Sequence, residues 1–567
     1  MSGPAAETKA QRAERLKREK DPWECLDEIR EFARRGFESI RPEWLGTYLR
    51  FWGVYTQGDG VGAIGGKGGE GKAVPYFMVR IRIPNGLLKA HQARTIATLT
   101  DKYAKGVADI TVRQNIQLHW VRIEDLPEVL ESLWRAGLTT MGACGDVTRN
   151  ITGCPVAGVD ADELFDASPL AIELDKYFVG NADFRNLPRK FKVSLTGCQS
   201  WCSYPEINDV GLTGVLRNRG GEPEKGFSLR VGGGLSTDPH LGLKLNAFVG
   251  WNQVVPVVKA VGEIFRDADV LRQSREKARL KFLFLKYGWN AETFLAELHS
   301  RLGFELDPAE HEFAPADVYR DHVGIHRQKQ AGYSFVGAAV LRGRLSGTQL
   351  KAAAELAERF SGGELRTTIM QNLLFINVRN ENATALAKEL ETLGLQTAGS
   401  PFFRGTVACT GTEFCKLAIT ETKGFARWLV EELDERVPGF EQQLRINITG
   451  CPNSCGQHWI ADLGLEGKKI KVDGQMRDAY YFCVGGAVGQ FQSIARPVGY
   501  RCLASEVPDA IERLLSRYQE DRFKGENLRQ FFARHTPEEL RGFLAGNFIA
   551  AVERDRPSAP VPHGVEG

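Results

Sequence analysis

The 567-residue chain has no strong excess of charge of either sign: 73 Lys and Arg stand against 71 Asp and Glu, a formal net charge of +2. Proteins that bind nucleic acid through its phosphates usually carry a strongly basic domain or stripe. The composition therefore predicts no nucleic-acid partner. A charged ligand must therefore be bound by a local group of charged side chains.

Long hydrophobic runs are also missing. Nowhere do about eighteen apolar residues follow one another, which excludes a membrane-spanning helix. Residues 1–20 are rich in Lys, Arg, Glu and Ala and contain no apolar segment, so they are not a secretory signal. We expect no membrane association, and we expect residues 1–20 to form a solvated, charged tail.

Cysteine is sparse and nucleotide fingerprints are absent. Eleven cysteines are too few for a secreted disulfide scaffold, and their odd number argues the same way, so we expect a reducing, cytoplasmic location. No Gly-x-Gly-x-x-Gly opens a helix, and the glycine-rich stretch 58–71 lacks the Gly-Lys-Ser/Thr ending of a phosphate loop. Residues 58–71 are expected to form a flexible loop.

Four cysteines in the C-terminal half form the strongest motif. Cys409 and Cys415 are separated by five residues, and Cys451 and Cys455 by three. This spacing suits a 4Fe-4S cube, in which each sulfur reaches a different corner, whereas zinc sites more often use pairs separated by two residues. The alternative of four ordinary buried thiols is disfavoured because both pairs carry glycine, which permits close approach.

An internal repeat divides the chain into two halves. Residues 109–118 recur as 366–375, and residues 196–202 recur as 449–455. Each half is predicted to open with a compact α+β unit, in the first half a strand near Tyr76 to Arg82 and a helix near Leu88 to Tyr103, and to continue as a longer α/β unit. Residues 274–286, which carry five basic residues, are expected to link the halves as a solvated helix.

Residues 408–418 and 447–455 resemble the sirohaem and 4Fe-4S nitrite and sulfite reductases, and the resemblance covers about residues 45–550. It implies an internally duplicated fold of mixed α+β and α/β class, with two ferredoxin-like half-domains and two sirohaem/cluster-type α/β domains. The expected divisions are an N-terminal extension (1–44), a half-domain and α/β domain in the first copy (45–140, 141–315), their second copies (316–400, 401–550) and a tail (551–567).

The resemblance also implies the cofactors and their ligands. Cys409, Cys415, Cys451 and Cys455 would hold one 4Fe-4S cluster, and Cys455 would also bind the sirohaem iron. A group of cations would bind the anionic substrate: Arg80, Arg149, Lys190 and Lys192. A second group would hold the macrocycle: Arg113, Gln114, Asn115, Gln117 and His119. For any one of these residues alone, a surface or structural role is the ordinary interpretation.

The first half departs from this cluster motif. It carries Cys144, Cys198 and Cys202, and Asn150 is interpreted as the counterpart of Cys415. Because stable clusters normally use four thiolates, we expect these cysteines, and Cys154, to be small core residues. Tyr55 and Cys144 are expected to lie together beside the sirohaem, either as separate side chains or joined by a thioether.

The expected activity is six-electron reduction of sulfite to sulfide, with ferredoxin as electron donor, a small oxyanion as substrate and a monomeric chain. Residues 149–158 resemble the nitrite reductase branch, whereas residues 190–192 resemble sulfite reductases, so reduction of nitrite to ammonia stays open as the alternative. A non-catalytic 4Fe-4S electron carrier or redox sensor is a third possibility. It would have no need of the cationic strand residues.

Overall fold

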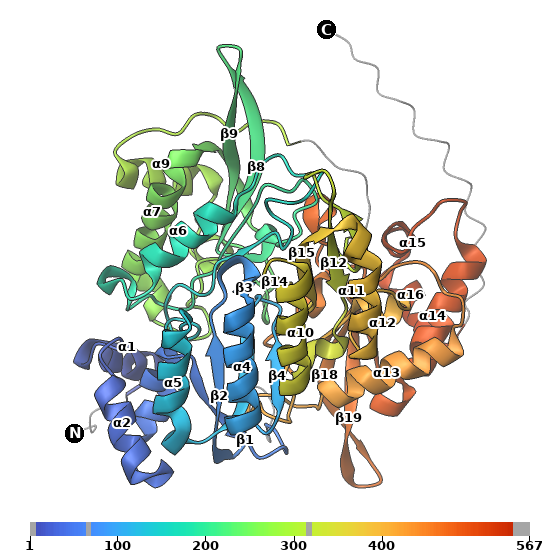
Figure 1. The fold of residues 1–567 in the computed structure, drawn as a ribbon, viewed down its shortest axis with the longest axis horizontal. Coiled ribbons are helices and arrows are strands. Elements are labelled where there is room, and N and C mark those ends of the chain that lie inside the picture. The colour runs from blue at the N-terminus through green and yellow to red at the C-terminus, as the bar shows by residue number, and fades with distance from the viewer. Residues whose placement is uncertain (1–6, 64–69, 313–319, 548–567) are drawn as a thin grey trace.

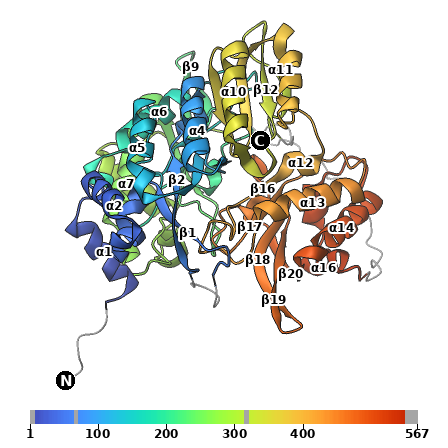
Figure 2. The ribbon, with the colours of Figure 1, turned by 60° about the horizontal axis from the view of Figure 1, so that its bottom comes forward.

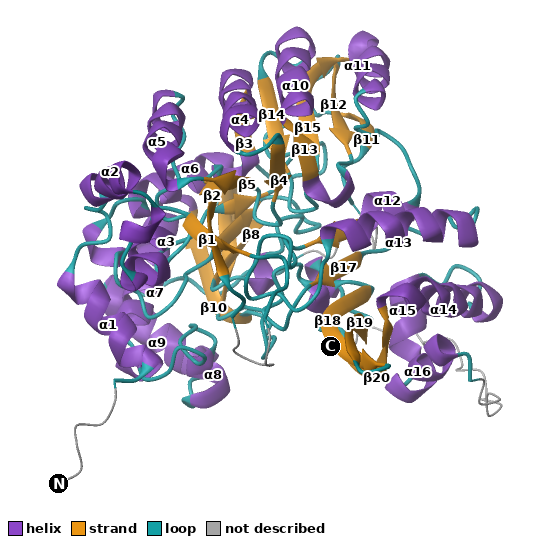
Figure 3. Ribbon diagram, turned by 90° about the horizontal axis from the view of Figure 1, so that it is seen from below, coloured by secondary structure: helices purple, strands orange, loops and turns teal. Residues whose placement is uncertain are grey.

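The computed structural model describes residues 7–63, 70–312 and 320–547. Figure 1 and Figure 3 show the plan, in which helices pack against the β-sheets. Each of the sheets built from the named strands has five strands. The predicted strand near Tyr76 and helix near Leu88 are present as β2 (Ala73–Ile81) and α4 (Ala90–Tyr103).

Two of the sheets belong to the compact half-domains. The first has the order β1 (Val54–Gly58), β2, β5 (Ile116–Val121), β4 (Val107–Ile110), β13 (Arg344–Ser346). The second has the order β11 (Gly324–Arg327), β12 (Tyr333–Ala338), β15 (Leu373–Arg379), β14 (Glu364–Thr367), β3 (Leu87–Lys89). Each half therefore lends one short edge strand to the sheet of the other, since β13 pairs with β4 and β3 pairs with β14.

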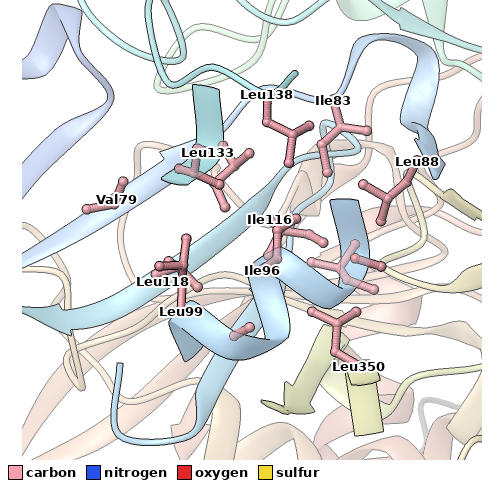
Figure 4. Packing of buried hydrophobic residues seen from close by; sticks show 14 of the residues in the cluster. Val79, Ile83, Leu88, Ile96, Leu99, Ile116, Leu118, Leu133, Leu138 and Leu350 are labelled. Atoms are coloured by element: carbon pink, nitrogen blue, oxygen red, sulfur yellow. The ribbon is translucent and has the colours of Figure 1, made fainter. Parts of the chain in front are cut away.

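The helices α4 and α10 (Gly347–Phe360) occupy equivalent positions beside these sheets, as Figure 2 shows. They share one buried hydrophobic cluster that includes Ile96, Leu99, Ile116 and Leu350 (Figure 4). Burial of Leu and Ile side chains stabilises by roughly 1.5–3 kcal/mol each. The shared core, together with the exchanged strands, joins the two half-domains into one unit.

The other two sheets repeat one topology. The first has the order β6 (Thr152–Gly153), β7 (Val193–Thr196), β8 (Val210–Arg219), β9 (Glu222–Val231), β10 (Leu243–Gly250). The second has the order β16 (Thr406–Ala408), β17 (Ile446–Thr449), β18 (Leu463–Val472), β19 (Gln475–Val484), β20 (Arg496–Leu503). In both sheets the first three strands are parallel and the rest antiparallel, which confirms the duplicated α+β and α/β fold.

The remaining helices cover these sheets or lie at the chain's N-terminal side. They are α1 (Lys9–Glu19), α2 (Leu26–Arg35), α3 (Leu49–Phe51), α5 (Leu126–Arg135), α6 (Ser168–Phe178), α7 (Val254–Asp267), α8 (Phe282–Lys286), α9 (Ala291–Leu302), α11 (Asn380–Thr392), α12 (Pro401–Gly405), α13 (Lys423–Arg436), α14 (Val507–Asp521), α15 (Leu528–Arg534) and α16 (Pro537–Ala545). Among the described residues, no helix is both long enough and apolar enough to cross a membrane.

Two expectations about charged segments are wrong. Residues 9–19 are not a solvated tail, because α1 buries Leu16 and the Lys17 ammonium, which pairs with Asp146 at 3.4 Å. Residues 274–286 are not a solvated helix either: Arg279 is only 7% exposed and Lys281 only 1%. Each segment has a cation that pairs with a residue distant in sequence, since Lys17 and Arg275 both contact Asp146. Part of the glycine-rich loop, residues 64–69, lies outside the described residues.

Candidate functional site

The four cysteines of the second half gather at the ends of two neighbouring parallel strands. Ala408 of β16 pairs with Ile448 of β17, so Cys409 and Cys451 leave the sheet at the same edge. The chain returns to this edge at Cys415 and Cys455. Cys451 is buried, Cys409 and Cys415 are half-buried, and Cys455 is exposed. An exposed sulfur beside three more enclosed ones can be shared with a second group.

Polar hydrogens point at these sulfurs. The Gly450 N–H donates to Cys409 Sγ at 3.2 Å, and the Asn453 side-chain amide donates to Cys451 Sγ at 3.5 Å. Donors of this kind stabilise the negative charge of metal-bound thiolates. At Gly411, where φ is +66°, a Cβ would lie 2.5 Å from Thr422 Oγ1, so only glycine lets the loop close around the thiols.

The electrostatics also fit a metal cluster. Burial, followed by the nearby Cys455 thiolate, raises the pKa of Cys415 to about 12, and burial raises the pKa of Cys409 and Cys451 as well. Such thiols keep their protons at neutral pH until a metal displaces them. Four converging sulfurs with N–H donors therefore fit a 4Fe-4S cluster.

The predicted substrate-binding cations come from three segments. Arg80 lies in β2, Arg149 precedes β6, and Lys190 and Lys192 precede β7. The Arg149 N–H donates to the Phe191 carbonyl at 2.8 Å, which places Arg149 beside the two lysines. Burial and then the charges of Arg189 and Arg279 lower the pKa of Lys190 to about 7, an effect that the Cys455 thiolate opposes. Lys190 is thus within electrostatic range of the exposed cluster sulfur.

The cations repel one another. Burial, then Lys190 and Arg113, hold the pKa of Lys192 well below its usual value, while burial and Arg149 lower the pKa of Arg113 to about 9. In the described part of the chain, no carboxylate forms an ion pair with Arg80, Arg113, Arg149, Lys190 or Lys192. The Nε atoms of Arg80 and Arg113 are buried without an acceptor. Buried cations without counter-ions are costly, so this group is suited to anions.

Arg80 connects two further residues of interest. Its guanidinium lies 5.3 Å from the centre of the Tyr55 ring, and its Nη1 donates to the Ala143 carbonyl at 3.4 Å. Ala143 immediately precedes the buried Cys144. One cation of the group therefore lies against both Tyr55 and the residue preceding Cys144.

The polar residues of the segment predicted to hold the macrocycle form contacts with other parts of the protein. Gln114 bonds the Gly153 N–H at 3.0 Å and the Thr367 carbonyl at 3.1 Å, linking the two halves. His119 is fully buried, bonds Asp109 at 2.9 Å and stacks on Phe414 at 3.8 Å.

Asn115 accepts the Ile83 N–H at 3.4 Å, and Gln117 contacts the Met78 sulfur at 3.1 Å. Of the segment 113–119, His119 is the residue that contacts the loop of Cys415, through its stacking on Phe414.

Sequence reasoning missed Arg279 and Asp209. Their ion pair, 2.9 Å long, is buried, and Asp209 also accepts the Lys192 backbone N–H at 2.8 Å. Arg279 lies in the segment expected to be solvated. In the sequence, Arg279 stands between the apolar residues Ala278 and Leu280, which are both buried in the structure. This pattern was the signal that the segment packs against the protein.

The assumed correspondence of first-half residues is wrong. Thr152 pairs with Ser194 as Val407 pairs with Asn447, so the residue equivalent to Cys409 is Cys154 and not Cys144. Six residues later, Asp160 stands where the second half has Cys415. Asn150 instead donates to the Ile83 and Arg113 carbonyls at 2.9 Å and supports the turn that carries Arg113.

Comparisons with known proteins agree with this geometry. The family model described as the nitrite and sulphite reductase 4Fe-4S domain matches residues 144–306 and 399–545, and that of the nitrite/sulfite reductase ferredoxin-like half domain matches residues 70–135 and 326–393.

Two relatives and one solved structure match nearly the whole chain. The assimilatory ferredoxin-dependent nitrite reductase of Haloferax mediterranei is 37% identical and covers 91% of this chain and 90% of its own. The sulfite reductase [ferredoxin] of Mycobacterium tuberculosis is 35% identical over 93% and 95%. The structure of the Mycobacterium tuberculosis NirA protein matches with a TM-score of 0.88 and 35% identity over 95% and 98%.

Proposed function

The chain belongs to the nitrite and sulfite reductase family, and we propose that within it the chain reduces sulfite to sulfide in six one-electron steps with ferredoxin as donor. The observation that supports sulfite is the presence of two lysines, Lys190 and Lys192, in one group of cations with which no carboxylate of the described residues forms an ion pair. Burial and like charges lower the pKa of both lysines, and a bound anion would raise both pKa values again and keep the two side chains as ammonium groups. Sulfite brings up to two negative charges and nitrite one. A second ammonium therefore favours sulfite.

Nitrite reduction is the second candidate. Residues 149–158 resemble the nitrite reductase branch, and relatives of similar identity carry either name. Both candidates share the same cofactors, a sirohaem and a 4Fe-4S cluster.

The residues divide the work as follows. Cys409, Cys415, Cys451 and Cys455 would hold the cluster, and the exposed Cys455 would also bind the sirohaem iron. Arg113, whose Nε is buried without an acceptor, would bind carboxylates of the sirohaem, and Gln114, Asn115, Gln117 and His119 would help to hold it. When bound, the two cofactors supply an iron site for the anion and electrons one at a time.

The remaining cations act on the substrate. Arg80, Arg149, Lys190 and Lys192 bind the anion and stabilise its negative charge. Because the pKa of Lys190 is about 7, its ammonium can give up a proton at neutral pH as substrate oxygens leave as water. Each proton that Lys190 donates is replaced from solvent.

The test uses the purified holoprotein. We expect chlorin-like visible bands, sulfide as product from sulfite, and six reduced ferredoxins consumed per sulfide. Lys190→Met should lower kcat/KM for sulfite, whereas Lys351→Met, at an exposed lysine of α10, should not. A spectrum of the cluster alone, without turnover of either anion, would support the electron-carrier alternative and contradict the proposal.

A further inference from the structure

A second group of thiols lies in the first half, at positions equivalent to those of the cluster cysteines. Cys154 follows β6, and Cys198 and Cys202 follow β7, as Cys409, Cys451 and Cys455 follow β16 and β17. The sulfurs of Cys198 and Cys202 are 3.5 Å apart. Sequence reasoning interpreted these residues as ordinary core thiols, but their strand positions bring all three to one edge of the sheet.

Two buried side chains aim unpartnered polar atoms at these sulfurs. His322 is 6% exposed, and its Nε2 has no hydrogen-bond partner among the described residues. Asp160 is 2% exposed, and its Oδ2 likewise has none. The ligand atoms of Cys154, Cys202 and His322 all lie within 4.8 Å of one another, as do those of Cys154, Asp160 and Cys198. Buried polar atoms are normally paired, so the unpartnered Nε2 of His322 beside two thiols is suited to bind a metal ion.

The surroundings favour a cation at this point. Val159, Phe335 and Leu374 form an apolar cluster around Cys154 and Cys198. Arg320 is the nearby charge: it bonds Asp160 Oδ1 at 3.0 Å and lies 3.8 Å from Cys198 Sγ. One guanidinium can offset the charge of Asp160, but not that of the three thiolates that form when a cation displaces the thiol protons. A divalent ion would neutralise the rest.

The distances distinguish a single ion from a cube. A tetrahedral zinc ion with Zn–S bonds of about 2.3 Å holds its sulfurs roughly 3.8 Å apart, close to the separation of Cys198 and Cys202. A 4Fe-4S cube holds its thiolates farther apart, because each sulfur binds a different iron. Among the described residues, no hydrogen bond joins any two of Cys409, Cys415, Cys451 and Cys455, in contrast with the first-half pair.

We propose that Cys154, Cys198, Cys202 and His322 bind one Zn²⁺ ion. Three thiolates and one imidazole are a common closed, structural zinc set. The thiol protons pass to solvent when the ion binds, and no electron is transferred. Asp160 holds Arg320 in place beside the thiolates. Because His322 comes from the second half of the chain, the ion ties the segment that enters β11 to the first-half sheet.

One of the proposed ligands, Cys202, lines a cavity. This cavity of about 120 Å³ is lined by Ser200, Cys202 and Arg320, together with residues of the second α/β domain. The site is separate from the four cluster cysteines, so this inference and the proposed function can fail independently.

The experiment measures zinc and iron per chain in the holoprotein, grown with zinc and dialysed against EDTA. We expect about one zinc per chain besides the iron of one cluster and one sirohaem. Cys154→Ser and His322→Ala should lose the zinc and keep the iron, while His322→Cys should keep both. Cys483→Ser, at a buried thiol outside the group, is the matched control and should also keep both.

Two results would overturn the proposal. The first is wild-type protein with less than about a tenth of an equivalent of zinc. The second is iron sufficient for two clusters, with one cluster lost in Asp160→Asn; zinc binding predicts no change in that variant. If Cys154→Ser does not fold, the wild-type stoichiometry and the comparison of His322→Ala with His322→Cys still decide the question.

Discussion

Replacing Lys192 by Asn removes one charge from the cation group with little disturbance of the backbone. The backbone N–H of Lys192 is held by Asp209 at 2.8 Å, and Asp209 is itself held by Arg279 at 2.9 Å. Neither contact uses the lysine side chain. The variant should therefore fold, and its kinetics should report the loss of the ammonium.

The size of the effect follows from Coulomb's law. At ~4 Å and an effective dielectric constant of ~20, one unit charge pair is worth up to ~4 kcal/mol before desolvation is subtracted. A net difference of ~1–2 kcal/mol between a doubly and a singly charged anion corresponds to about tenfold in selectivity. Lys192→Asn should therefore move the ratio of kcat/KM for sulfite to kcat/KM for nitrite about tenfold toward nitrite.

The assay measures kcat/KM for both anions with reduced ferredoxin. Lys192→Arg, which keeps the charge, should stay closer to the wild-type ratio, and Lys351→Asn, at an exposed position, should match it. An unchanged ratio in Lys192→Asn would refute the reasoning. So would an equal shift in Lys192→Arg, because geometry rather than charge would then set the preference.

Four further predictions test other parts of the structure. Cys455→Ser should lower the iron content and abolish the sirohaem bands, while Cys483→Ser should do neither; unchanged spectra in Cys455→Ser would contradict the ligand assignment. Arg82→Met should destabilise the protein by ~3–5 kcal/mol, because it leaves Asp175 without its buried ion-pair partner, and an unchanged thermal midpoint would argue against this. Burial alone would raise the pKa of Glu312, but hydrogen bonding by Arg230 lowers this pKa to about 2. The stability that the ionised carboxylate contributes is therefore present above pH ~4.5 and lost toward pH 2. The unfolding midpoints of Glu312→Gln and wild type should differ at pH 6 and converge near pH 2. Peptide mass analysis should find Tyr55 and Cys144 either as one linked peptide or as two unmodified peptides, and the second result would dispose of a thioether.

Local patterns predicted the strand and the helix of the first half-domain, and they placed the four second-half cysteines in two loops. The helix predicted near Leu88 to Tyr103 corresponds to α4, with Ile96 and Leu99 buried. The spacing of Cys409, Cys415, Cys451 and Cys455 was informative because each pair lies in one loop directly after a strand. In such cases the sequence distance limits the spatial distance, so a motif can be interpreted without the fold.

The features that the sequence did not reveal depend on strand register and on contacts between residues distant in sequence. The equivalence of Cys154 with Cys409 depends on the register of β6 against β7. The sequence contains another cysteine before β6, Cys144, and without this register the comparison selects Cys144 instead. The basic segment 274–286 resembled a solvated helix because its partners are far away in the chain. Arg275, for example, bonds Asp146 at 2.6 Å across more than a hundred residues.

Sulfite reduction is tested most directly by competition between the two anions. The wild-type holoprotein, reduced ferredoxin and equal concentrations of sulfite and nitrite are mixed, and the initial rates of sulfide and ammonia formation are measured together. Their ratio equals the ratio of the two kcat/KM values. Two ammonium groups in the cation group predict that sulfide forms faster than ammonia. Ammonia formed faster than sulfide would contradict the account.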